Sequence, residues 1–177
     1  MSDQNNLLLN YQKILNCISH LPKQILSLHS LDNVQQFVLH GICNKNCFNI
    51  PKAAYFIDNP DFDFIQGIAG FSNLEPYPHD HDIWLNTDTF CEFIKNSDFN
   101  NKIKNFNEPS VKKNDSLNKT VEKISNDIGF NKPSFCCWQM KHDNHGLLIY
   151  EKEDDILDSF NDHFLNSLHL LSFCHVG

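Results

Sequence analysis

Cysteine and histidine side chains are the groups in this chain whose spacing could support chemistry. Cys43 and Cys47 are four residues apart, and His40 precedes Cys47 by seven. On a helix these three side chains would share one face and could hold a metal ion. The spacing is not that of a zinc finger, however, and no second paired cluster follows. We therefore expect Cys43 to be core filler and predict no metal and no other cofactor.

A second candidate is the run His79-Asp80-His81-Asp82. Two imidazoles and two carboxylates in one loop can bind a divalent cation weakly or titrate near neutral pH. Neighbouring side chains in an extended segment point in opposite directions, which works against convergence on one ion. We interpret the run as an exposed, solvated loop.

Cys136 and Cys137 lie in an expected strand, and His142 and His145 lie in the adjoining turn. A Cys/His nucleophile pair is geometrically conceivable there. Nothing supplies a recognisable oxyanion hole, and the chain has no phosphate-cradling glycine loop, paired-carboxylate motif or nucleophile elbow. We predict that the chain is not an enzyme and keep a Cys-dependent redox enzyme as the alternative.

Aromatic residues with polar handles form the fourth candidate site. Such groups line apolar ligand pockets in which a few hydrogen bonds fix the ligand, although they can also fill an ordinary core. We predict a ligand-binding role for these residues, which are Tyr55, Phe64, Trp84, Trp138 and Tyr150.

Composition narrows the classes of function. The 177-residue chain has a net charge of −8, and all of its 14 basic residues are Lys. Without Arg there is no bidentate fork for base edges or phosphates, so we predict no direct nucleic-acid binding. The apolar stretch at residues 7–9 is too short for a signal peptide or a membrane span. Seven Cys without regular spacing indicate reduced thiols and a cytoplasmic protein.

Apolar periodicity predicts one domain over residues 1–177 that alternates helices with pairs of strands. Leu117, Val121, Ile124 and Ile128, for example, repeat at helical spacing. Residues 96–115 are rich in Asn and Lys and are predicted to be a mobile loop. The predicted helices cover residues 5–20 (ending near Pro22), about 32–50, 116–128 and 156–171, with a short helix or irregular segment near 84–94. The predicted strands cover residues 52–58, 62–71, 135–140 and 147–150.

This order predicts an α+β fold, an antiparallel β-sheet with flanking helices. The terminal helices would cover one face of the sheet, and the 72–115 region would cover the other. We expect a ligand pocket between the sheet and that covering region. The first and last helices both carry apolar stripes, so we also predict a homodimer that pairs through them.

Several segments carry a resemblance to a known family. Lys52-Ala-Ala-Tyr-Phe-Ile-Asp58, and His145-Gly-Leu-Leu-Ile-Tyr-Glu151 followed by the last helix, resemble the GAF/PAS-like sensor fold over residues 31–172. Phe37-Val-Leu-His-Gly-Ile42 and the segment 162–171 are similar to the N-terminal regulatory domain of LuxR-type transcription regulators. Asp88 stands where autoinducer-binding members carry a Tyr, which argues against an acyl-homoserine lactone and adds Asp88 to the candidate ligand-binding residues.

The resemblance implies a signal-sensing regulatory domain that binds a small apolar molecule, in a transcription regulator whose DNA-binding part is not in this chain. Ligand binding would order residues 72–115 and shift the terminal helices. The alternative is a protein-protein interaction domain with a filled core and an acidic surface.

Overall fold

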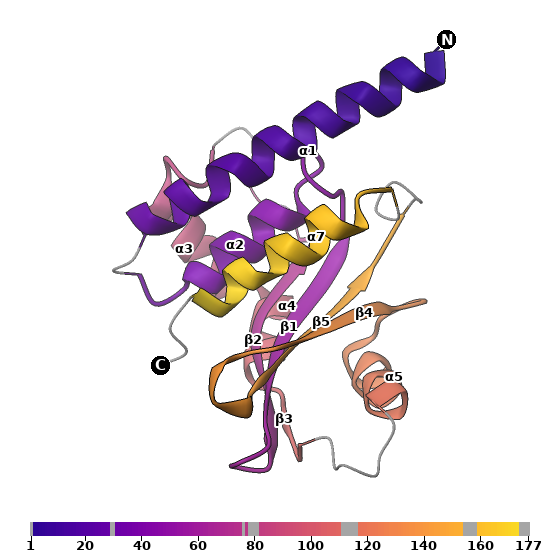
Figure 1. The fold of residues 1–177 in the computed structure, drawn as a ribbon. Helices are drawn as coiled ribbons and strands as arrows, with labels where there is room; N and C mark the ends of the chain where they lie inside the picture. Colours follow the sequence, from indigo (N-terminus) through magenta and orange to yellow (C-terminus); the bar gives the residue numbers. More distant parts are fainter. Residues whose placement is uncertain are drawn as a thin grey trace.

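An antiparallel sheet is the centre of the fold (Figure 1). The computed structural model describes residues 2–28, 31–75, 77, 82–110, 117–153 and 159–173. Within these ranges the sheet has five strands in the order β3-β2-β1-β5-β4. The α+β class predicted from the sequence is confirmed. The strands are β1 (Lys52–Asn59), β2 (Phe64–Ser72), β3 (Asn107–Glu108), β4 (Ser134–Gln139) and β5 (His145–Glu151).

Two hairpins build most of this sheet, as the sequence predicted. β1 pairs with β2, and β4 pairs with β5, while β1 and β5 join the hairpins at the centre. The turn between β4 and β5 places His142 and Asp143 at positive φ. This turn is polar and exposed, which suits residues that leave the sheet.

Helices precede, interrupt and follow the strands. Among the described residues they are α1 (Ser2–Ser27), α2 (Val34–Cys43), α3 (Thr87–Asn96), α4 (Asp98–Lys104), α5 (Leu117–Ile128) and α7 (Asn161–Leu168), the last followed by the 3-10 helix η2 (His169–Phe173). The prediction that the first helix ends near Pro22 is wrong, because α1 continues through this residue. Leu21 and Leu28 are buried on either side of Pro22, and their packing offsets the backbone hydrogen bond that proline cannot donate.

The predicted mobile loop over residues 96–115 is also corrected. Its first part forms α4, whose N-terminus is capped by Ser97, and residues 107–108 form β3. Asn100 and Ile103 are the buried residues of α4. Because α4 has so few buried positions and is otherwise rich in Asn and Lys, its sequence shows no helical repeat of apolar residues. Residues 111–116 of this segment lie outside the described residues.

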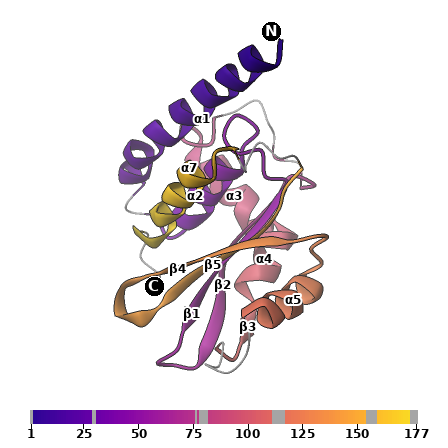
Figure 2. The ribbon, with the colours of Figure 1, turned by 45° about the vertical axis from the view of Figure 1, so that its right-hand side comes forward.

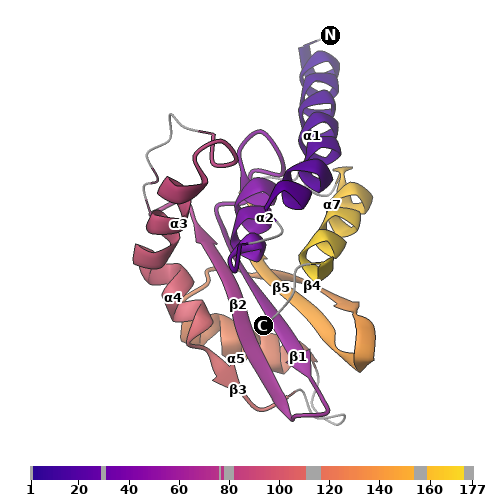
Figure 3. The same cartoon turned by 90° about the vertical axis from the view of Figure 1, so that its left-hand side faces the viewer.

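Side chains pack against both faces of the sheet in two separate cores. Tyr55, Ala69 and Leu148 face a core that includes residues of α1, α2, α3 and α7. Phe56, Leu147 and Ile149 face the second core, which includes residues of α4 and α5. Figures 2 and 3 show α4 and α5 on one side of the sheet, with α2 and α7 on the other and α1 outermost. The N-terminal part of α1 projects beyond the body (Figure 1).

The 72–115 region was predicted to cover the face opposite the terminal helices, and only part of it does so. α4 packs on that face, where Gly67 of β2 leaves room for it: a Cβ on Gly67 would lie 1.9 Å from the carbonyl oxygen of Ile103. α3 packs instead against α2, with the rings of Phe37 and Phe90 4.3 Å apart. No helix within the described ranges is long and apolar enough to cross a membrane.

Candidate functional site

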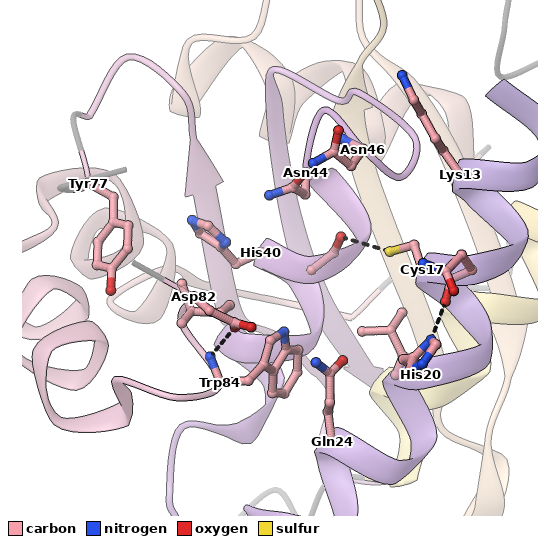
Figure 4. A pocket seen from close by; sticks show the side chains of 14 residues that line it. Lys13, Cys17, His20, Gln24, His40, Asn44, Asn46, Tyr77, Asp82 and Trp84 are labelled. Atoms are coloured by element: carbon pink, nitrogen blue, oxygen red, sulfur yellow. Dashed lines mark hydrogen bonds between the residues drawn. The ribbon is translucent and has the colours of Figure 1, made fainter. Parts of the chain in front are cut away.

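A cleft of about 600 Å³ opens between α1, the C-terminal end of α2 and the segment that leads to α3 (Figure 4). Its volume lies in the range of small-molecule sites, roughly 300–1,000 Å³. The lining residues are Lys13, Asn16, Cys17, His20, Leu21, Gln24, His40, Gly41, Asn44, Asn46, Tyr77, Asp82, Ile83 and Trp84.

The close approach of α1 to α2 depends on Gly41 at the base of the cleft. A Cβ at this position would lie 2.9 Å from Leu21 of α1 and 3.3 Å from the ring of Trp84. The carbonyl oxygen of Gly41 also accepts a long hydrogen bond from the thiol of Cys17, with the atoms 3.8 Å apart. Gly41 therefore brings three parts of the chain together at one point.

A short turn holds Trp84 at the edge of the cleft. The backbone N–H of Trp84 donates to the carboxylate of Asp82 over 2.9 Å, and the carbonyl of Asp82 accepts from the backbone of Leu85 and Asn86. The indole ring lies 5.5 Å from the ring of Phe37 on α2. Trp84 thus presents a half-buried aromatic face beside the carboxylate of Asp82 (Figure 4).

Polar groups from two helices surround this aromatic face. Lys13, Asn16, His20 and Gln24 come from one side of α1. His40 of α2 is half-buried, and its ring contacts the rings of Phe71, Tyr77 and Phe90 at 5.0–5.9 Å. The cleft therefore offers an ammonium group, a carboxylate, side-chain amides and imidazoles around the aromatic ring of Trp84.

Two groups in the cleft have perturbed acidities. Burial, and then the negative charge of Asp82, raise the pKa of Tyr77, so its hydroxyl stays neutral at physiological pH. A hydrogen bond with the thiol of Cys47 lowers the pKa of Cys17, while partial burial acts in the opposite direction. Cys17 is therefore the cleft group with the greater tendency to act as a nucleophile.

No protein-family model, curated protein or solved structure matches this chain.

Three of the aromatic residues predicted to bind a ligand do come together, but in the core between the sheet and α7. The rings of Tyr55 and Trp138 stack 5.7 Å apart at 8°. The indole N–H of Trp138 donates to Ser172 over 2.8 Å, and the ring of Tyr150 lies 5.2 Å from that of Phe164. These contacts are those of packed core residues rather than of a vacant pocket.

The other three predicted residues lie apart from this group. Trp84 alone lines the cleft. Asp88 is exposed in the first turn of α3, and Phe64 is half-buried at the start of β2 with its ring 6.3 Å from Phe62. The six residues therefore do not form one pocket.

Sequence reasoning missed most of the cleft. Lys13, Asn16, His20 and Gln24 repeat at intervals of three and four residues, which places them on one face of α1. That polar stripe could have identified α1 as one wall. Nothing in the sequence could have indicated that the segment around Trp84 supplies the opposite wall.

The cysteine and histidine candidates separate in the fold. Cys43 and Cys47 are buried, whereas the ring of His40 points toward aromatic residues. Among the residues that the structure describes, no three His, Cys, Asp or Glu side chains form a group that could hold a metal ion. His79, Asp80 and His81 lie outside the described residues.

Cys136 and Cys137 lie in β4, and neither thiol is activated. Burial raises the pKa of both, and the negative charge of Asp58 raises that of Cys137 further. Cys137 is exposed, and Cys136 is half-buried with its thiol 3.9 Å from the hydroxyl of Tyr150. The surroundings favour the neutral thiol, which is the poorer nucleophile.

Proposed function

We propose that this chain is a signal-sensing regulatory domain that binds a small molecule in the cleft between α1, α2 and Trp84. The observation that carries the proposal is the convergence of an aromatic face with polar side chains from two helices around a space of about 600 Å³. The site differs from the one predicted from the sequence because side chains of the two cores cover the sheet faces.

The chemistry of the cleft indicates a polar ligand with a flat group, rather than the purely apolar molecule expected from the sequence. The indole of Trp84 can stack against a flat or cationic group, and the neighbouring carboxylate of Asp82 favours positive charge. The ammonium group of Lys13 on the opposite wall favours negative charge. A small aromatic zwitterion has a flat ring, a positive charge and a negative charge, and so matches the indole, the carboxylate and the ammonium group.

A ligand in this cleft would contact α1 and the Trp84 turn at the same time. It would therefore favour positions of α1 in which both contacts can be made, and α1 would carry the signal. The resemblance of the sequence to LuxR-type regulatory domains supports transcription regulation as the output. The reduced thiols expected from the sequence support a cytoplasmic location.

Thermal unfolding with and without added ligand tests the proposal. The probes are L-tryptophan, L-histidine and a panel of nucleosides, and native mass spectrometry of the freshly purified chain detects any molecule already bound. A probe at about a hundred times its Kd should raise the Tm by roughly 5–10 °C.

Matched variants place the binding site. Lys13→Gln and Trp84→Leu should reduce the Tm shift, whereas Lys23→Gln, an exposed position of α1 outside the cleft, should not. A shift that survives both cleft variants would place the ligand elsewhere. If no probe shifts the Tm and no molecule is bound on purification, the protein-interaction alternative replaces this proposal.

A second proposal concerns self-association. The projecting part of α1 carries Leu8 and Leu9, which are 57% and 50% exposed, and α7 carries Leu165 at 38%. We propose that these side chains pair across a two-fold axis in a homodimer. Native mass spectrometry should show a dimer that Leu8→Glu with Leu9→Glu converts to a monomer, and a monomeric wild-type chain would exclude it.

A further inference from the structure

A second hollow lies between α1 and α7. It is a groove of about 790 Å³ whose surface is mainly apolar, with Leu15 and Ile18 of α1 among its lining residues. The two helices meet at one end of the groove, where the ring of Tyr11 lies 5.5 Å from that of Phe160 and 5.8 Å from that of His163 (Figure 3). The groove is therefore a built feature of the helical layer, separate from the cleft on the other side of α1.

The groove carries no formal charge in a chain that is otherwise rich in charged residues. None of the described residues that line it is Asp, Glu or Lys, although these types make up 20% of the sequence. The projecting part of α1 shares this property, because residues 7–12 are Leu-Leu-Leu-Asn-Tyr-Gln. Leu8 and Leu9 in this segment are exposed. Two surfaces of this kind can cover each other without removing a charge from water.

The apolar residues of α1 on the groove side follow a coiled-coil spacing. They are separated by three, four and three residues and form a line that we call the groove seam, which consists of Leu8, Tyr11, Leu15 and Ile18. A different line of α1, which includes Ile14 and Leu21, is buried in the core. In the groove seam, by contrast, the first two residues are exposed and the last two are half-buried. One apolar line of α1 is thus left only partly covered.

The groove seam is symmetrical about Lys13. Leu8 and Ile18 each lie five residues from this position, and Tyr11 and Leu15 each lie two residues from it. In two α1 helices that cross antiparallel there, Leu8 of each copy lies opposite Ile18 of the other, because the rise per residue is constant. The side chain of Lys13 lines the cleft instead, so this arrangement does not bring two ammonium groups together. The seam is therefore complementary to itself across a two-fold axis.

We propose that the groove between α1 and α7 is the docking site for the projecting part of α1 from a second copy of this chain, with the two α1 helices antiparallel. Leu8 of each copy enters the groove of the other, beside Ile18 and Ser19 of its wall. This inference rests on the proposed homodimer and adds the surface on which each copy receives its partner.

Variants of opposite charge test the docking site. Leu8→Lys would carry an ammonium group into the partner's groove, and Ser19→Glu would place a carboxylate on its wall. Both positions are exposed in the single chain, so the fold should be retained, which circular dichroism checks. Each variant alone should raise the dimer Kd at least about tenfold, because a charge is then held against an apolar surface. Leu26→Lys, at an exposed leucine of α1 outside the groove, is the matched control and should leave the Kd unchanged.

An equimolar mixture of Leu8→Lys and Ser19→Glu chains separates groove docking from other pairings. In a mixed dimer, one groove brings the new ammonium group beside the new carboxylate, and the other groove makes the wild-type contact. With one variant labelled with nitrogen-15, native mass spectrometry should show mixed dimers well above the proportion expected from random pairing.

The outcomes distinguish the two proposals. A wild-type chain that stays monomeric would exclude the homodimer and the docking site together. A wild-type dimer that either variant leaves intact, or variants that show no preference for mixed pairs, would overturn the docking site and leave the homodimer in place.

Discussion

At the scale of single residues, Cys17 and Cys137 are thiols in opposite surroundings. The hydrogen bond with Cys47 lowers the pKa of Cys17 below its ordinary value of 9.0, whereas burial and the charge of Asp58 raise that of Cys137. Cys17 therefore has the larger thiolate fraction at neutral pH, and thiolate is the form that reacts with alkylating reagents.

We expect iodoacetamide to modify Cys17 faster than Cys137 at neutral pH, although Cys137 is the more exposed. As pH rises, the rate at Cys17 should level off before the rate at Cys137, because the group with the lower pKa is fully ionised first. Site-resolved mass spectrometry over a pH series measures both rates. Cys47→Ala removes the hydrogen bond and should move the Cys17 profile to higher pH; an unchanged profile would show that the hydrogen bond does not set the reactivity of Cys17.

The residue scale also shows what the sequence could and could not predict about the site. Aromatic residues with polar handles were assigned to a pocket, but Tyr55, Trp138 and Tyr150 satisfy one another and their neighbours in the core. Residue type alone cannot separate these outcomes, because a core and a ligand pocket use the same side chains. The polar residues that line the cleft from α1, by contrast, repeat at helical spacing in the sequence. A helix face that is simply exposed to solvent has the same pattern, so the repeat does not identify a binding site.

At the scale of elements, the helices and strands with extended apolar repeats were predicted well, whereas short elements were predicted poorly. The helix predicted over residues 116–128 is α5, and all four predicted strands are present. α4 was missed because it has only seven residues and only two of them, Asn100 and Ile103, are buried. Its buried Asn100 accepts a hydrogen bond from the N–H of Gly70 on β2 over 3.0 Å. Such a contact has no signature in the local sequence.

Glu75 makes the contacts that fix the N-terminus of α4. Its carboxylate accepts from the backbone N–H of Phe99 over 2.7 Å and from the hydroxyl of Ser97, which in turn caps the helix by accepting from Asn100. We predict that Glu75→Gln lowers the free energy of unfolding by about 1 kcal/mol, because the amide replaces a charged double acceptor.

Thermal unfolding checks this prediction, with a decrease in Tm of roughly 2–4 °C expected for that loss. Glu92→Gln is the matched control, because Glu92 is an exposed acid on α3. Equal effects of the two substitutions would show that net charge, rather than the cap of α4, accounts for the change.

At the scale of the whole molecule, one sheet is shared by two cores. Trp84 and Trp138 pack against the core that α2 and α7 cover, whereas Ile124 of α5 is buried in the core on the opposite face. β1 and β5 contribute alternate side chains to both cores, as Tyr55 and Phe56 illustrate. Loss of either core would therefore expose one face of the same strands.

We predict that Ile124→Ala lowers the free energy of unfolding by about 2–5 kcal/mol and that both tryptophans report this loss. Urea unfolding followed by tryptophan fluorescence and by far-ultraviolet circular dichroism should give coincident transitions, with the midpoint shifted equally in both signals. Leu74→Ala, at a side chain that is 85% exposed, should leave the midpoint unchanged. A circular dichroism transition that moves while the fluorescence transition stays in place would mean that the two cores unfold independently. In that case changes on the far side of the sheet would not reach α1 and the cleft.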